Sequence, residues 1–191
     1  MNKKIALAAL LAAAFSAHAE VLTFDDLGNY SSPGANYGGI SWSNLYTLNG
    51  HTYNPAGTGY EHGIVSGDYV LFNSGGAAGT LSATDADGFD LSDAYFTAAW
   101  HDALHVTADA TFMDGTHQSM SFVVDMAGPT DEVFHWNNLQ SVKFSTADNN
   151  WFALDNVNTA ATLAVPEPAT DALILAGLGL LGFAARRRKG A

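Results

Sequence analysis

The stretch LHVTADATFMDGTHQSMSFVVDM, residues 104–126, decides the fold class. In its first half, apolar or small residues alternate with polar ones from Leu104 to Phe112, and a second alternation follows from Ser119 to Met126. A period of two places one set of side chains on a single face of an extended chain, so both segments are predicted to be half-buried strands. The Asp114-Gly115 dipeptide between them is typical of a tight turn. The stretch therefore predicts an antiparallel β-hairpin.

Further strand-like segments lie on both sides of this hairpin, each short and bounded by Gly, Asn, Asp or Pro. They are 21–24, 39–46, 68–73, 79–84, 94–100, 132–136, 141–145 and 151–157. Between the two ends of the chain, no stretch of about ten residues shows the apolar stripe of an amphipathic helix. About ten short strands separated by turns predict an all-β fold, an antiparallel two-sheet sandwich.

The first nineteen residues, MNKKIALAALLAAAFSAHA, have the three parts of a secretory signal peptide. Lys3 and Lys4 precede an apolar run over 5–15, and Ala17-His18-Ala19 is a cleavage signal of the small-x-small kind. We therefore expect an exported protein whose mature chain begins at Glu20. The alternative is an N-terminal membrane anchor, but the apolar run is short against the span of about 20 residues that a membrane requires.

The other end carries a Pro-Glu-Pro turn, an apolar run over 172–185 and a basic cluster. The turn consists of Pro166, Glu167 and Pro168, and the basic cluster consists of Arg186, Arg187, Arg188 and Lys189. Cations near a membrane span stay in the cytoplasm, so this cluster is expected to retain the chain in the inner membrane while the preceding residues are exported. As a helix the apolar run rises about 21 Å, against a hydrocarbon core about 30 Å thick. A short transmembrane helix that acts as a temporary anchor is therefore predicted.

This order of elements resembles the PEP-CTERM sorting signal. The resemblance covers 165–189, and its one departure is Asp171, where the family usually has an apolar residue. It implies processing by an exosortase, a membrane enzyme of Gram-negative bacteria associated with exopolysaccharide production. An ordinary C-terminal tail anchor is the alternative. We accordingly predict a signal peptide over 1–19, an exported domain over 20–164 and a sorting signal over 165–191.

The predicted domain is strongly acidic. Of the seven Lys and Arg residues only Lys143 lies between the two ends, together with seventeen of the nineteen Asp and Glu residues. Nucleic acid is not an expected partner, because binding its phosphates requires cations. Salt bridges cannot offset so much negative charge, which leaves screening salt, backbone caps or bound cations to do so. The chain has no cysteine, so disulfides and cysteine nucleophiles are excluded.

The domain also resembles small ectodomains that often precede this tail. The similarity lies in TFDDL at 23–27, FDLSDAYFTAAW at 89–100 and FALDNV at 152–157. It implies a jelly-roll sandwich like those of carbohydrate-binding modules, in which a structural ion is commonly held where the first and last strands meet. Three acidic residues stand at the matching places: Asp25, Asp26 and Asp155. Carboxylate oxygens suit Ca²⁺, so a structural calcium ion is expected; the alternative is that these residues form a turn and a solvated strand position.

The segment 30–62 is rich in Gly, Asn and Tyr and supports a second site hypothesis. Flat aromatic rings cover the apolar side of a sugar ring, and neighbouring Asn and His groups bond its hydroxyls. Three tyrosines are expected to form such a glycan-binding platform: Tyr46, Tyr53 and Tyr60. The alternative is that some tyrosines of this segment fill the core or cover sheet edges.

The sequence gives little support for catalysis. It contains no His-Glu-x-x-His helix for zinc and no Gly-x-Ser-x-Gly elbow for a serine nucleophile. The many carboxylates leave one alternative, a small secreted hydrolase that acts on matrix polysaccharide. The prediction is a non-enzymatic protein of the cell surface or extracellular biofilm matrix, with a structural or adhesive role in association with exopolysaccharide and calcium.

Overall fold

The structure, a computed structural model, describes residues 20–161. The predicted signal peptide lies outside the described residues, and so does the predicted sorting signal with its Pro-Glu-Pro turn, apolar run and basic cluster. Residues 20–161 contain no helix that is long and apolar enough to cross a membrane.

The described chain is built almost entirely of strands, as the sequence predicts. The strands are β1 (Glu20–Leu22), β2 (Ala35–Tyr37), β3 (Ile40–Ser43), β4 (Leu45–Asn49), β5 (Tyr69–Asn73), β6 (Gly79–Ala83), β7 (Phe89–Ala98), β8 (Leu104–Phe112), β9 (His117–Val124), β10 (Thr130–Thr146) and β11 (Phe152–Ala161). One short helix, α1 (Gly59–His62), and two 3₁₀ turns, Ser74–Gly76 and Ala147–Asn149, complete the elements. All the strand pairs are antiparallel, so the predicted all-β sandwich class is confirmed.

The hairpin of β8 and β9 forms where the alternating pattern predicts it. Thr111 pairs with His117, and the chain reverses through Asp114 and Gly115, whose φ is 82°. The Asp114 carboxylate accepts hydrogen bonds from the Thr116 backbone N–H at 2.9 Å and from the Thr116 hydroxyl at 2.6 Å. An aspartate followed by glycine thus fixes this turn through one side chain and one left-handed residue.

Strand β10 differs from the prediction, since 132–136 and 141–145 belong to one continuous strand. Its first half pairs with β7, and its second half lies between β6 and β8. The register shifts in the middle, where His135 and Asn138 have φ values of 51° and 64°. Bulges of this kind bend a strand and increase its twist, which lets β10 serve two layers.

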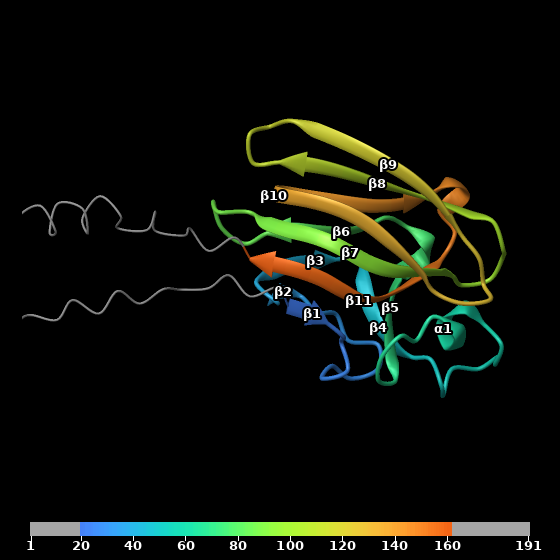
Figure 1. Cartoon of the computed structure of the whole chain (residues 1–191). Coiled ribbons are helices and arrows are strands. Elements are labelled where there is room, and N and C mark those ends of the chain that lie inside the picture. The colour runs from blue at the N-terminus through green and yellow to red at the C-terminus, as the bar shows by residue number, and fades with distance from the viewer. Residues whose placement is uncertain (1–19, 162–191) are drawn as a thin grey trace, which may run out of the picture. The chain divides into compact units, whose positions relative to one another are not determined.

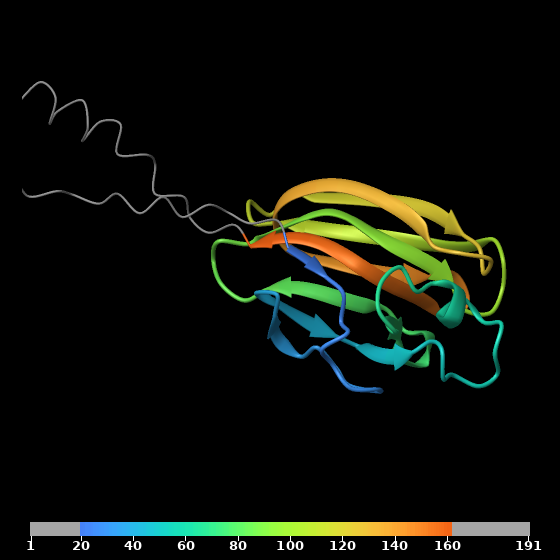
Figure 2. The same ribbon diagram turned by 60° about the horizontal axis from the view of Figure 1, so that its bottom comes forward.

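These pairings give two layers that share β10 (Figures 1 and 2). The first layer has the order β4-β5-β11-β7-β10, with β1 beside the end of β11, and the second has the order β2-β3-β6-β10-β8-β9. The predicted strand 39–46 is also divided between the layers, because Asn44 adopts a φ of 56° between β3 and β4. The Asn44 side-chain amide donates to the Ser74 carbonyl oxygen at 3.1 Å, which holds the chain at this corner.

The main core lies between the two layers around Phe96 of β7. Its ring centroid lies 5.0 Å from that of Phe122, 5.1 Å from that of Phe144 and 5.7 Å from that of Phe152. Phe122 and Phe144 belong to the second layer and Phe152 to the first, so one side chain joins the two layers. Phe96 is fully buried.

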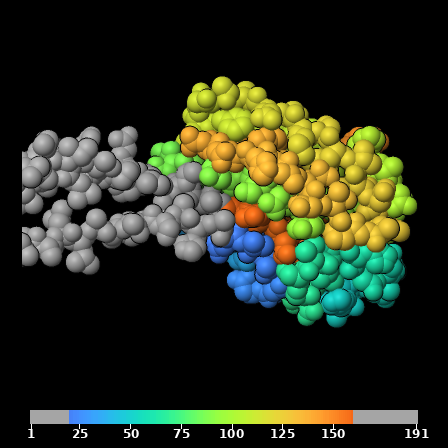
Figure 3. All heavy atoms as spheres, in the orientation of Figure 1, coloured from blue at the N-terminus to red at the C-terminus, as the bar shows by residue number. Residues whose placement is uncertain are grey.

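The outer face of the first layer is covered by the segment 50–68, which includes α1. Figures 1 and 2 show this segment, in teal, beside the strands of the first layer, and the space-filling view shows it at the surface next to β10 (Figure 3). The close approach requires Gly59, because a Cβ there would lie 1.8 Å from the Ala98 carbonyl oxygen. The Gly59 backbone N–H donates to the Ala99 carbonyl oxygen at 2.9 Å. This glycine therefore lets α1 rest directly on the end of β7.

Candidate functional site

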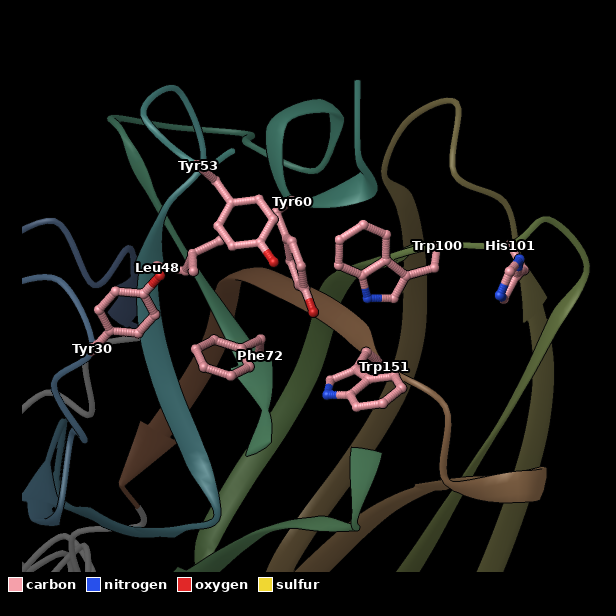
Figure 4. Close-up of a pocket in the computed structure, with 8 residues that line it drawn as sticks. All are labelled: Tyr30, Leu48, Tyr53, Tyr60, Phe72, Trp100, His101 and Trp151. Atoms are coloured by element: carbon pink, nitrogen blue, oxygen red, sulfur yellow. The ribbon is translucent and has the colours of Figure 1, made fainter. Parts of the chain in front are cut away.

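A hollow of about 480 Å³ lies between the segment 50–68 and the outer face of the first layer (Figure 4). Its lining is mainly aromatic: Tyr30, Leu48, Tyr53, Tyr60, Phe72, Trp100, His101 and Trp151. The strands β4 and β5 and helix α1 each supply one of these residues, and the others come from the connections around them. We call this hollow the aromatic pocket.

Three rings form one wall of the aromatic pocket. The ring centroids of Tyr53 and Tyr60 are 5.1 Å apart, those of Tyr60 and Trp100 are 5.6 Å apart, and those of Tyr53 and Trp100 are 6.0 Å apart. The rings stand at steep angles to one another, with 89° between Tyr60 and Trp100. Such edge-to-face pairs contribute about 0.5–1.5 kcal/mol each beyond the burial of their area, so the wall is held in place by its own packing.

Phe72 forms the floor between this wall and the rest of the first layer. Its ring centroid lies 6.0 Å from that of Tyr60, and its side chain projects outward because Leu71, its neighbour on β5, projects into the main core. The alternation of a strand thus supplies both a core residue and a pocket residue from adjacent positions.

Burial governs the chemistry of the tyrosine hydroxyls in the wall. Tyr60 is buried, and this burial raises the pKa of its phenol well above the ordinary value, while a hydrogen bond with Trp100 lowers it by less. Burial also raises the pKa of Tyr53. Both phenols therefore stay neutral at physiological pH and keep the O–H that donates hydrogen bonds.

Two further aromatic residues stand at the rim, open to solvent. Tyr30 is 60% exposed and Trp151 is 37% exposed. Tyr30 has a φ of 57°, a left-handed conformation that is uncommon for a bulky residue, and its backbone N–H donates to the Thr47 carbonyl oxygen at 2.8 Å. The Tyr30 ring meets Phe72 edge to face with 6.4 Å between centroids. Backbone strain that places an exposed ring over a pocket points to a functional position.

The structure brings two of the three tyrosines of the predicted platform into one site. Tyr53 and Tyr60 line the aromatic pocket, whereas Tyr46 lies outside the lining, half-buried, with its ring 6.3 Å from that of Phe72. Sequence reasoning missed Trp100 and Trp151. Both lie at the ends of predicted strands, where an aromatic residue looks like part of the strand, and only the pairing of β7 with β11 brings them together.

The predicted metal ligand Asp155 is fully buried on the outer face of β11. Its Oδ2 atom accepts hydrogen bonds from the backbone N–H groups of Val65 at 2.8 Å and Ser66 at 3.1 Å, and its Oδ1 atom accepts one from Asn156 at 2.7 Å. Burial raises the pKa of Asp155 to about 6; these three bonds lower the pKa, and the nearby Asp25 raises it further.

Asp25 holds the same loop from the other side. Its Oδ1 atom accepts from the backbone N–H groups of Asp68 at 2.8 Å and Tyr69 at 3.2 Å. Asp26 is placed differently, because its carboxylate accepts a hydrogen bond from the Tyr37 hydroxyl at 2.6 Å. The structure therefore pairs Asp25 and Asp155 around one loop and joins Asp26 to strand β2.

A calcium ion bound near Asp25 and Asp155 would have few side-chain ligands. Residues 20–161 contain no group of three or more His, Asp or Glu side chains that could hold a metal ion. Asp25 and Asp155 already accept backbone hydrogen bonds, so carbonyl and water oxygens would have to supply most of the six to eight ligands that Ca²⁺ takes. Calcium binding by Asp25, Asp26 and Asp155 thus stays a prediction.

Comparison with known protein families confirms the sorting signal. Residues 164–189 match the family described as the PEP-CTERM protein-sorting motif. This motif indicates an exported protein that is processed by an exosortase and is held transiently in the membrane through its C-terminus. No curated protein matches the sequence of this chain.

Solved structures with a similar fold include carbohydrate-binding modules. The tandem CBM22-1-CBM22-2 domain of Paenibacillus barcinonensis Xyn10C is 14% identical with a TM-score of 0.47, and the match covers 82% of this chain and 48% of that one. This chain therefore spans about half the length of that structure. The CBM22-1 xylan-binding domain of the same organism is 12% identical with a TM-score of 0.45, covering 78% of this chain and 100% of the other.

A third similar structure is TmCBM61 in complex with beta-1,4-galactotriose, at 11% identity and a TM-score of 0.40, covering 69% of this chain and 97% of that one. The sorting motif and the described strands together show an exported protein in which an antiparallel β-sandwich precedes a PEP-CTERM sorting signal.

Proposed function

We propose that the β-sandwich is a non-catalytic domain that binds polysaccharide in the aromatic pocket. Its role would be structural or adhesive, in association with exopolysaccharide at the cell surface or in the extracellular matrix of a Gram-negative bacterium. The observation that carries this proposal is a rigid wall of Tyr53, Tyr60 and Trp100 facing two solvent-open rings, Tyr30 and Trp151.

The size and surface of the pocket suit a segment of a sugar chain. Its volume of about 480 Å³ falls within the range of ligand pockets, about 300–1,000 Å³. Exposed apolar ring faces gain about 25 cal/mol for each Å² that a ligand removes from water, and the C–H face of a pyranose ring is flat and apolar. The neutral tyrosine hydroxyls and the indole N–H of Trp151 supply donors for the sugar hydroxyls, whereas the indole N–H of Trp100 donates to Tyr60.

The lining favours binding over hydrolysis. A glycosidase requires two carboxyl groups flanking the scissile bond, whereas the residues that line the aromatic pocket include no Asp or Glu. A hydrolase therefore remains the second candidate, and a test for released sugar separates it from a binding domain.

The sorting signal supports the proposal that the domain acts outside the cell. An exported domain reaches the polysaccharide outside the cell, where the pocket is useful. Calcium held at Asp25 and Asp155 would stabilise the loop 65–69, which continues into β5 and so supports Phe72 at the pocket floor.

The proposal is tested with purified residues 20–164, which contain both layers and the core, on a panel of immobilised polysaccharides. We expect retention on at least one of them and a loss of affinity of about tenfold or more in Trp151→Ala, which corresponds to about 1.4 kcal/mol. Val123→Ala serves as the control, because Val123 is 46% exposed on β9 and lies outside the pocket. Equal retention of Trp151→Ala and wild type would overturn the proposal, and sugar released into the liquid would favour the hydrolase.

A further inference from the structure

The aromatic pocket is the first of three neighbouring hollows, which together we call the groove. A small hollow beside it shares Trp100, His101 and Trp151 with the pocket and adds Leu104 and Asn150. A third hollow shares His101, Leu104 and Asn150 with the second. The shared residues place the three hollows next to one another along the connections at this end of the sandwich.

The far end of this groove is acidic. The third hollow is lined by Asp102 and Asp148, together with the imidazoles of His101 and His105. The Asp102 Oδ1 atom accepts a hydrogen bond from the Met126 backbone N–H at 2.8 Å, which fixes that side chain. Asp148 is exposed in the 3₁₀ turn before β11, and its backbone φ of 61° is left-handed. A ligand seated on the aromatic rings would thus extend toward two carboxylates.

Among the described residues, no Lys or Arg lines the groove. Lys143 is the only Lys or Arg in residues 20–161, and its ammonium group lies 3.4 Å from the carboxylate of Asp109 on strands β10 and β8 of the second layer. No guanidinium or ammonium group is therefore available to pair with a uronate or sulfate bound in the groove. The net charge of the chain, −12, adds a general repulsion for anionic polymers.

We infer that the groove selects polysaccharides that carry protonated amino groups, such as partly deacetylated amino-sugar polymers, over neutral and acidic ones. This inference rests on the proposed function and names its substrate class. One sugar lies against Tyr30, Tyr53 and Trp151, and the ammonium group of a following sugar lies between Asp102 and Asp148. The aromatic wall contributes as well, because the faces of Trp and Tyr rings attract cations.

The test compares oligomers that differ only in their amino groups. Glucosamine hexamers with β-1,4 and β-1,6 linkages, and the N-acetylated forms of both, are titrated into residues 20–164 at pH 6. We expect at least one glucosamine hexamer to bind about five- to tenfold more tightly than its N-acetylated form at low salt, as suits an ion pair near the surface. Because salt screens exposed charges, this preference should shrink in about 0.5 M NaCl.

Two double variants separate the groove from the general charge of the domain. Asp102→Asn with Asp148→Asn should lose the preference for the glucosamine form. Asp85→Asn with Asp87→Asn removes the same charge from the connection before β7, at the other end of that ten-residue strand, and should keep the preference. Each Asn retains an oxygen that accepts a hydrogen bond, so the fold is preserved.

The outcomes distinguish this inference from the proposed function. Equal binding of both forms, or equal effects of the two double variants, overturns the amino-group selectivity and leaves polysaccharide binding in place. Retention of neutral polysaccharides on the panel without binding of any glucosamine hexamer has the same consequence. Binding of no glycan of any kind overturns both proposals.

Discussion

Two clusters of aromatic rings on opposite faces of the first layer differ in what surrounds them. Around Phe96, phenylalanine rings from both layers pack against one another, and each of them is at most 9% exposed. In the aromatic pocket the rings belong mostly to Tyr and Trp, and Tyr30 and Trp151 remain open. Phenylalanine has no polar atom to satisfy, whereas Tyr and Trp have an apolar body with a donor at its edge. The choice of aromatic residue thus separates the cluster that holds the fold together from the cluster that meets a ligand.

Removing the ring at the centre of the core should have the largest effect. Phe96→Ala leaves a cavity between the layers and is expected to lower the free energy of unfolding by about 3–5 kcal/mol. Chemical denaturation measures this change, and Phe96→Leu, which fills most of the cavity, should lose clearly less. A loss below about 1 kcal/mol for the alanine variant would contradict the role of Phe96 as the residue that joins the layers.

The buried carboxylate of Asp155 should make stability depend on pH. The pKa of Asp155 is raised from 3.8 to about 6 in the folded state, so the folded chain binds more protons than the unfolded chain between these values. The stabilisation of the folded state by this difference in pKa is present in full below pH 3.8 and is lost as the pH rises through about 6. The free energy of unfolding changes by about 3 kcal/mol in total.

Thermal unfolding between pH 4 and 7.5 in the presence of a chelator measures this dependence, with Asp155→Asn as the reference that removes the titrating group. The difference in stability between wild type and the variant should move in favour of wild type as the pH falls. Calcium bound at Asp155 would favour the charged form, flatten this dependence and raise the melting temperature at pH 7. A calcium effect of the same size in Asp155→Asn would remove Asp155 from the metal site.

Lifting α1 from the sheet should disturb the pocket more than the core. In Gly59→Ala the new methyl group would collide with the Ala98 carbonyl oxygen, and overpacking of this kind costs about 1–3 kcal/mol. Because α1 carries Tyr60, polysaccharide binding should weaken as well. Gly128→Ala is the matched control, since a Cβ at Gly128 meets no atom within 4 Å. Unchanged polysaccharide binding in Gly59→Ala would show that the pocket does not depend on the position of α1 on the end of β7.

The smallest effect on stability is expected at the rim. Trp151→Ala, the variant that should reduce binding about tenfold, is expected to lower the free energy of unfolding by about 1 kcal/mol, because this side chain is 37% exposed and loses less burial than Phe96 does. Denaturation beside Phe96→Ala provides the comparison. A loss of several kcal/mol would place Trp151 with the residues that hold the fold together.

The sequence predicted correctly those elements that are determined by residues close together in the chain. The hairpin of β8 and β9 follows from a period of two and an Asp-Gly turn, and both signals lie within 104–126. The continuity of β10 was not predicted, because the bulges at His135 and Asn138 resemble a break between two strands. The reverse happened at 39–46, which was predicted as one strand. The left-handed backbone of Asn44 divides this segment into β3 and β4.

The site was harder to predict than the fold, because its residues meet only through pairings distant in sequence. Tyr53 and Tyr60 share one segment and were predicted, but Trp100 and Trp151 become neighbours only when β7 pairs with β11. The strained backbone that aims Tyr30 leaves no signal in the sequence. The placement of Tyr46 outside the lining likewise depends on how β4 lies against β5.

The position of Lys143 has a consequence for how long the domain survives outside the cell. Its backbone lies within β10 between Thr80 of β6 and Asp109 of β8, so the peptide bond after it is enclosed by neighbours on both sides. Within residues 20–161 it is the only bond that a protease specific for Lys or Arg recognises. Such proteases act on extended, unpaired chain, so cleavage there requires the sandwich to open. The domain should therefore resist trypsin-like digestion for as long as it stays folded, and the rate of cleavage at Lys143 should follow its unfolding.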